Sequence, residues 1–169
     1  MPNSSSLTYS VTATLVEVLP AAQAPGAATE AARTVTQAGF NAAQRVLKSD
    51  SSPPVTCGAL FQQALTTGAA TIDLTALDGF NDKAVNGTGM RVQLLRVRNP
   101  ATNANPISIA KGAANGYDGL GAAFKVTLAP GAEATFFPND AGSDVGAANC
   151  TLDLAGTLAQ ALDVEIIMG

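Results

Sequence analysis

The sequence contains no histidine and no tryptophan, and these two absences remove whole classes of function. Without histidine, a nucleophile activated by an imidazole base and a zinc ion held by imidazole nitrogens are both excluded. Aromatic residues make up only 5% of the chain, and its tyrosines are Tyr9 and Tyr117. Sugar-binding modules usually stack their ligands on aromatic side chains, so this shortage argues against a carbohydrate-binding platform.

Charged residues are also scarce. They make up 13% of the sequence and leave a net charge of −4 at pH 7. Proteins that bind nucleic acids or anionic membranes concentrate lysine and arginine, so this acidic balance predicts neither of them as a partner. No apolar run approaches the roughly 18 residues of a membrane-spanning helix, and the start, MPNSSSLTYS, lacks the features of a secretory signal. We therefore expect synthesis in a cytoplasm.

Only two thiols occur, Cys57 and Cys150, and they lie far apart in the chain. Each is surrounded by small or apolar residues. In a chain without a secretion signal, this context favours two buried free thiols over a disulfide. Their separation also lacks the spacing of paired metal ligands. The sequence therefore predicts no metal site and no cofactor.

Short runs of valine, isoleucine, leucine and phenylalanine are interrupted by turn-forming residues along most of the chain. Residues 89–138 hold four such runs, separated by Asn-Pro, Asn-Gly, Asp-Gly and Pro-Gly pairs. This pattern indicates strands joined by tight turns. Apolar and polar residues alternate over residues 161–168, as in a strand with one buried face. The adjacent Leu94 and Leu95 indicate either a strand covered on both faces or a β-bulge.

We expect about eight to ten strands in all. No amphipathic pattern long enough for a crossover helix occurs, so a parallel α/β sheet is not favoured. The predicted fold is all-β: an antiparallel β-sandwich of jelly-roll type with long loops and an extended N-terminal arm. Because 169 residues fit a single domain, we expect a flexible arm over residues 1–7 and one sandwich domain over residues 8–169.

The N-terminal third is less regular. Residues 7–19 alternate like a half-buried strand, but the alternation slips between Val16 and Glu17, which predicts a bulge or the end of pairing near that point. Residues 20–33 are rich in alanine and hold two prolines, and we expect a loop with one helical turn over residues 29–32. For residues 34–48 we favour two strands over a helix, because an isolated two-turn helix is marginal.

Three groups of residues could carry chemistry. The loop of residues 111–121 is rich in glycine, but Lys111 precedes the glycines, unlike in a phosphate-binding loop, so a flexible surface or interface loop is expected. A later loop contains four residues with side-chain oxygens that could bind a calcium ion: Asn139, Asp140, Ser143 and Asp144. Such side chains also form hydrogen bonds with their own backbone in turns, so both interpretations apply. Asp73 and Asp153 lie on polar phases of strands and are interpreted as solvated carboxylates rather than as an acid–base pair.

Positive charge is concentrated locally at Arg91, Arg96 and Arg98, along one predicted strand. Such arginines could bind carboxylates of a partner surface with two hydrogen bonds each. They could equally be charges on an edge strand that prevent unwanted pairing between sheets. Both interpretations stay open.

Over residues 70–169 the chain resembles the head-decoration, or cement, proteins of tailed bacteriophages and prophages. The matching blocks are ATIDLTALDG, NGTGMRVQLLRVRNP, ANPISIAKGAANGYDGLGAAF, LAPGAEATF, NDAGSDV and TLDLAGTLAQALDVEIIMG. Their order and spacing carry more weight than any single block, and residues 21–32 fall outside the resemblance. The resemblance implies a non-enzymatic β-sandwich subunit on the capsid surface of the virion. Its partners would be the major capsid protein and copies of itself, as a homotrimer or another symmetric oligomer.

On this basis we expect the N-terminal arm and the arginine-bearing strand to contact the shell. The candidate contact residues are Pro2, Asn3, Leu7, Arg96 and Arg98. No catalytic, cofactor-binding or metal-binding residues are predicted. The alternative is a carbohydrate- or receptor-binding β-sandwich module of a virion or cell surface. An enzyme is the least favoured hypothesis, because no nucleophile and base can be paired.

Overall fold

The computed structural model describes residues 14–19, 31–36, 54–79, 83–138 and 142–169. Within these residues all regular elements are β-strands, and every pairing between strands is antiparallel. The predicted all-β, antiparallel class is therefore confirmed. The chain divides into two compact units, residues 5–48 and residues 49–169 together with residues 1–4. The two larger sheets use strands between residues 57 and 168, and the start of the sandwich domain at residue 8 stays a prediction.

The first unit contains a two-stranded sheet of β1 (Thr14–Leu19) and β2 (Ala31–Thr36). The pairing is continuous from Thr14 to Leu19, so neither the bulge nor the end of pairing expected near Val16 and Glu17 occurs there. Backbone pairing does not require strict alternation of side-chain types. The helical turn expected over residues 29–32 is also wrong, because β2 begins within it. A single helical turn fixes several dihedral angles for one hydrogen bond and is unfavourable on its own.

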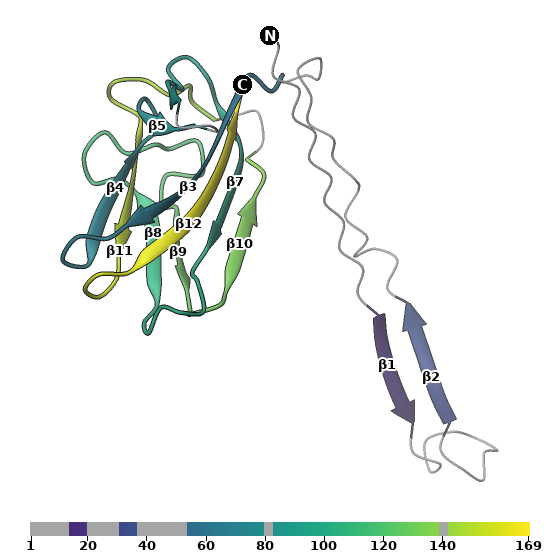
Figure 1. Ribbon diagram of the computed structural model, residues 1–169. Coiled ribbons are helices and arrows are strands. Elements are labelled where there is room, and N and C mark those ends of the chain that lie inside the picture. Colours follow the sequence, from purple (N-terminus) through teal and green to yellow (C-terminus); the bar gives the residue numbers. More distant parts are fainter. Residues whose placement is uncertain (1–13, 20–30, 37–53, 80–82, 139–141) are drawn as a thin grey trace. The chain divides into compact units, whose positions relative to one another are not determined.

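The second unit is built from two four-stranded sheets, which form two layers in Figure 1. The first sheet has the order β10 (Glu133–Phe136), β7 (Val92–Arg98), β12 (Ala161–Met168) and β3 (Cys57–Ala64). The second sheet has the order β4 (Ala69–Asp73), β11 (Thr151–Ala155), β8 (Ile107–Lys111) and β9 (Lys125–Leu128). A short pair is formed by β5 (Leu77–Asp78) and β6 (Ala84–Val85).

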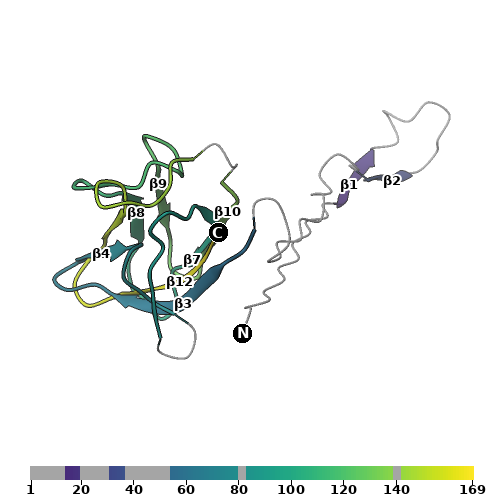
Figure 2. The ribbon, with the colours of Figure 1, turned by 90° about the horizontal axis from the view of Figure 1, so that it is seen from above.

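Apolar side chains from both sheets form one shared core. Figure 2 shows the two sheets from above. Alternate residues of β12 supply the core from the first sheet, and β8 and β11 supply it from the second. These central residues are at most 2% exposed: Leu162, Val164, Ile166, Met168, Ile107, Ile109, Leu152 and Leu154. Burying one large aliphatic side chain contributes about 1.5–3 kcal/mol. The core is therefore the main attraction between the sheets, and the residues between its members face outward.

The adjacent Leu94 and Leu95 of β7 are both buried, and both explanations offered for them hold in part. Leu95 belongs to the shared core, whereas Leu94 lies on the other phase, opposite Ile167 of β12. The pairing of β12 with β7 shifts its register between Ile167 and Met168, as at a β-bulge, and leaves Gln93 without an opposite residue. Strand β7 is thus covered on both phases at its start and bulged against its neighbour.

Candidate functional site

The outward side of the first sheet carries two rows of side chains, one residue from each strand. The first row consists of Gln62, Asp163, Arg98 and Glu133, which are successive register partners. The second row consists of Leu60, Glu165, Arg96 and Thr135, paired in the same way. We call these eight residues the charged face. It is the candidate functional site because it gathers five ionisable side chains on one surface.

Each of the two central strands of the charged face carries charges of one sign, and we call the face residues of one strand a column. Strand β12 contributes two carboxylates, Asp163 and Glu165, and β7 contributes two guanidinium groups, Arg96 and Arg98. Because successive side chains of a strand point to opposite sides, residues two apart share a face. Neighbouring strands lie about 4.8 Å apart, so an acidic column runs directly beside a basic one. Opposite charges across neighbouring strands stabilise a sheet modestly.

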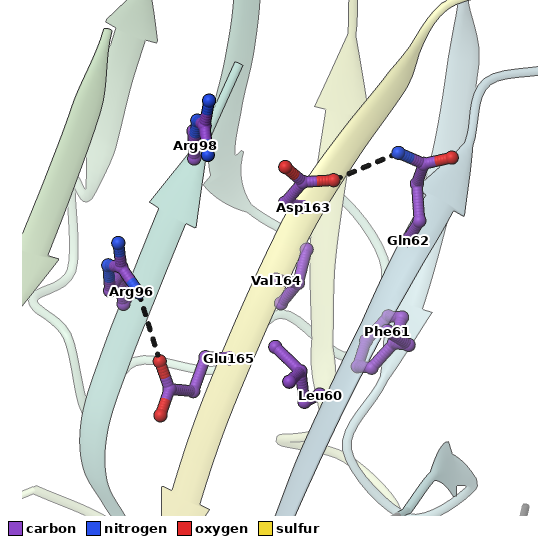
Figure 3. Close-up of a pocket in the computed structure, with 8 residues that line it drawn as sticks. All are labelled: Leu60, Phe61, Gln62, Arg96, Arg98, Asp163, Val164 and Glu165. Atoms are coloured by element: carbon purple, nitrogen blue, oxygen red, sulfur yellow. Dashed lines mark hydrogen bonds and ion pairs between the residues drawn. The ribbon is translucent and has the colours of Figure 1, made fainter. Parts of the chain in front are cut away.

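Arg96 is held by two carboxylates. Its Nη2 lies 3.0 Å from Oε2 of Glu133, and its Nη1 lies 3.5 Å from Oε2 of Glu165. Figure 3 shows the second of these ion pairs. The hydrogen bond and the charge of Glu133 raise the pKa of Arg96 above its ordinary value. All three side chains are partly exposed, so the pairs orient Arg96 more than they stabilise the fold.

Arg98 differs from its neighbour. It is exposed, and in the described part of the chain its guanidinium forms no hydrogen bond or ion pair. Asp163, which lies opposite Arg98 on β12, instead accepts a hydrogen bond from Nε2 of Gln62 at 2.9 Å. In Figure 3 this bond runs toward β3, away from Arg98. The donors of Arg98 are therefore available to a carboxylate from outside the molecule.

A hollow of about 300 Å³ lies on the charged face. Figure 3 shows the residues that line it: Leu60, Phe61, Gln62, Arg96, Arg98, Asp163, Val164 and Glu165. Leu60 is 56% exposed, one of two large apolar side chains exposed to this degree in the described ranges. The hollow thus combines an apolar contact with charged groups of both signs, a composition suited to a polar partner surface.

The structure brings together only some of the predicted contact residues. Arg96 and Arg98 lie side by side in the basic column, whereas Pro2, Asn3 and Leu7 lie outside the described residues.

Arg91 is not part of the charged face. It forms an ion pair with Asp144, with its Nε 2.6 Å from Oδ1. Asp144 was a candidate calcium ligand and is instead engaged by this ion pair. Two other candidates, Asn139 and Asp140, lie outside the described residues. Within the ranges that the structure describes, no three acidic or cysteine side chains are grouped as metal ligands.

Asp73 and Asp153 have specific partners in addition to solvent. The Asp73 carboxylate accepts hydrogen bonds from the backbone N–H and the hydroxyl of Thr75, at 2.8 and 2.7 Å. These bonds lower the pKa of Asp73 below its ordinary value. Asp153 accepts from the hydroxyl of Thr71 at 2.9 Å and from the backbone N–H of Ala113 at 2.8 Å. Both carboxylates therefore tie loops to strands.

The glycine-rich loop is tied down at several points, so its expected flexibility is corrected over residues 112–117. Tyr117 is 1% exposed, and its hydroxyl oxygen accepts a hydrogen bond from the backbone N–H of Val92 at 3.1 Å. The carbonyl of Thr151 accepts from the N–H groups of Gly112 and Tyr117, at 3.0 and 2.9 Å. A single aromatic residue among glycines was the available signal for this anchor, and sequence reasoning missed it.

A second hollow of about 550 Å³ lies between this loop and the end of β10, and it is lined mainly by glycine and apolar residues such as Phe136. Asp118 is the one ionisable residue in its lining. Among the other reactive groups, Cys150 is a buried free thiol, and Cys57 is a partly buried one. Burial raises the pKa of both thiols. None of these features gathers as many polar groups as the charged face.

In the described part of the chain, no helix has the length and apolar character needed to cross a membrane. No family model matches the sequence, and neither the curated proteins nor the solved structures contain a match to it.

Proposed function

We propose that this protein is a non-enzymatic structural protein of a bacteriophage virion that decorates the head shell and stabilises it by binding the major capsid protein. The proposal includes a jelly-roll fold for the second unit. Without the short β5–β6 pair, eight strands remain there, and the first sheet takes the first, third, sixth and eighth of them in chain order. This division supports a jelly roll, an architecture of viral capsid and lectin domains.

Fold alone does not decide function, so the proposal needs a contact. The observation that carries it is Arg98, an exposed guanidinium without an ionic partner in the described ranges, beside the oriented Arg96. A planar guanidinium binds a carboxylate through two parallel, charge-assisted hydrogen bonds. We assign to Arg98 the role of binding a carboxylate on the shell surface, with Arg96 supporting it by its charge.

We propose a second contact with the capsid shell, made by the N-terminal residues Pro2, Asn3 and Leu7. A flexible arm that orders on a shell exchanges chain entropy for contact area. Copies of the chain are proposed to assemble on the capsid surface as a homotrimer or another symmetric oligomer, after synthesis in the host cytoplasm.

The test uses head particles that lack this protein, prepared from the phage or prophage that encodes it. Purified full-length protein is mixed with the particles, and the bound fraction is measured after sedimentation. Arg98→Glu should lower the binding constant at least about tenfold, because it replaces an attraction by a repulsion. The control Lys125→Glu, which changes the net charge equally on exposed β9, should bind like the wild type.

Three results would contradict this proposal or a part of it. Unchanged binding of Arg98→Glu would remove the charged face from the shell contact. Wild-type protein that does not bind the particles at all would refute the decoration function. Deletion of residues 1–6 tests the arm separately, and unchanged binding of that variant would remove the arm from the contact.

A carbohydrate- or receptor-binding module is the second candidate function. The hollow of the charged face favours it, because Gln62 and Asp163 present hydrogen-bonding groups beside the exposed Leu60. Such a mixture of polar and apolar groups is typical of ligand sites. Binding to a glycan array that Asp163→Ala abolishes would support this function, whereas an array without specific binding would argue against it.

A further inference from the structure

We infer that the charged face binds a second copy of this chain across a two-fold axis. The inference concerns the same surface as the proposed shell contact, but it needs no shell and can be tested in solution. It rests on the arrangement of charge on the face, which is complementary to itself. Because one face holds one partner at a time, the copy and the shell would be alternative partners of Arg98.

The charged face is complementary to a second copy of itself because its acidic and basic columns lie side by side. A two-fold axis that runs along the strands, midway between β12 and β7, places the acidic column of one copy over the basic column of the other. Asp163 then faces Arg98 of the second copy, which is the guanidinium without an ionic partner in the described ranges. Because the operation is two-fold, each contact occurs twice.

The outer columns match under the same operation. Gln62 of β3 comes to lie over Glu133 of β10, where its amide can donate to the carboxylate. Leu60, which is 56% exposed, comes to lie over the methyl group of Thr135 and would lose much of its contact with water.

Other positions of the axis are disfavoured. An axis along β7 would place guanidinium groups over guanidinium groups, and an axis along β12 would place carboxylates over carboxylates. Like charges brought together across an interface are strongly unfavourable. The charge pattern therefore favours the axis between β12 and β7, which places all four charged residues of these two strands opposite a residue of the other sign.

The size of the face predicts a weak interaction. Four strands spaced about 4.8 Å apart, with two rows about 7 Å apart, cover about 270 Å² on each copy. Stable interfaces bury about 800 Å² on each partner. The ion pairs are also exposed to solvent, where about 0.1 M salt screens charges beyond about 10 Å. We expect a dissociation constant on the order of 100 µM at low ionic strength, as in small transient complexes.

The experiment measures self-association of the full-length protein by sedimentation velocity. The wild type should associate at about 20 mM salt and dissociate at about 500 mM, because salt screens exposed ion pairs. Arg98→Glu and Asp163→Arg should each weaken self-association at least about tenfold, because each places like charges opposite one another. A matched control exists for each change of charge: Lys125→Glu for the first and Asp78→Arg for the second, both on exposed residues outside the face.

Mixing the two variants gives the decisive measurement. In a 1:1 mixture, the introduced glutamate of one variant faces the introduced arginine of the other, while the native Asp163 faces the native Arg98. The mixture should therefore associate about as strongly as the wild type, although each variant alone associates at least about tenfold more weakly. A contact that does not pair residue 98 of one copy with residue 163 of the other would not be restored in this way. Circular dichroism checks that both variants are folded. If Asp163→Arg is not, Asp163→Asn and Arg98→Gln must each weaken self-association.

Three results would overturn the inference: a wild type that stays monomeric at about 1 mM protein and low salt, self-association that neither variant weakens, or a mixture that stays monomeric. The outcome is separable from that of the proposed function. A protein that binds shells but is monomeric refutes the two-fold pair alone. A protein that self-associates as described but ignores shells refutes the decoration function alone.

Discussion

Asn99 is a buried polar residue at the end of β7, directly after Arg98, and its removal should destabilise the second unit. Its side chain is 0% exposed. Nδ2 donates hydrogen bonds to the carbonyl oxygens of Leu128 and Asn105, at 2.9 and 3.2 Å. Oδ1 accepts a hydrogen bond from Nδ2 of Asn103 at 2.6 Å. Through these bonds Asn99 ties β7 to the start of β8 and to the end of β9.

The expected cost of Asn99→Ala follows from what each partner loses. Nδ2 of Asn103 keeps a hydrogen bond to the carbonyl of Ala161 at 2.7 Å. The carbonyl of Asn105 keeps one from Nε2 of Gln160 at 2.8 Å. The side chain of Asn99 loses its three hydrogen bonds, to Leu128, Asn105 and Asn103. Each contributes about 0.5–1.5 kcal/mol, and the small cavity adds to this. We expect a loss of about 2–4 kcal/mol, a large part of a typical stability of about 5–15 kcal/mol.

The assay is urea unfolding followed by far-UV circular dichroism, because the chain has no tryptophan. Asn105→Ala is the matched control, since both bonds at that residue use its backbone carbonyl and survive the change. Asn99→Asp should be at least as harmful as Asn99→Ala, because a carboxylate would face carbonyl oxygens. If Asn99→Ala costs less than about 0.5 kcal/mol, the range of a neutral surface change, the buried hydrogen bonds do not stabilise the fold as argued.

Three other changes test separate parts of the structure. Gly116→Ala should cost about 2–4 kcal/mol in thermal unfolding, because its Cβ would overlap the backbone carbonyl of Gly112; an unchanged midpoint would contradict the close approach. Thr75→Val removes the hydroxyl bond to Asp73 and should raise the pKa of that carboxyl toward its ordinary 3.8 in an NMR titration. Because the native pKa is lowered, Asp73 stabilises the fold above its unfolded pKa of about 3.9, and this contribution is lost as pH falls through the native value. The variant should therefore be less stable near neutral pH and approach the wild type in acid; a difference independent of pH would refute the linkage. Cys150 is 5% exposed and should react about 100-fold more slowly with a thiol reagent in the native state than in urea; equal rates would contradict its burial.

The strands were largely predictable, because a half-buried strand leaves a period of two in the sequence. The strand predicted over residues 161–168 coincides with β12. The adjacent leucines of β7 signalled its irregularity, although only the structure places the register shift against β12. The N-terminal third was predicted less well, because alanine-rich sequence is compatible with a loop, a helical turn or a strand such as β2.

The charged face was predictable only in part. The spacing of Arg96 and Arg98 puts both side chains on one face of any strand, and the structure places them on one face of β7. The acidic column on β12 was not found, because its position beside β7 depends on pairing between segments more than 60 residues apart. The loop residues Tyr117 and Asn99 were missed for a similar reason: their burial is decided by tertiary packing rather than by local pattern.

The position of β12 has a consequence for how the protein is made. Among the strands of the first sheet β12 is the last in the sequence, yet it lies between β7 and β3. During translation, β3 and β7 emerge early and have no common neighbour until residues 161–168 have left the ribosome. Their apolar sides stay exposed to water during that interval, which makes the nascent chain prone to aggregation. A nonsense mutation shortly before residue 161 would therefore yield a polypeptide cleared by proteases, not a shortened subunit.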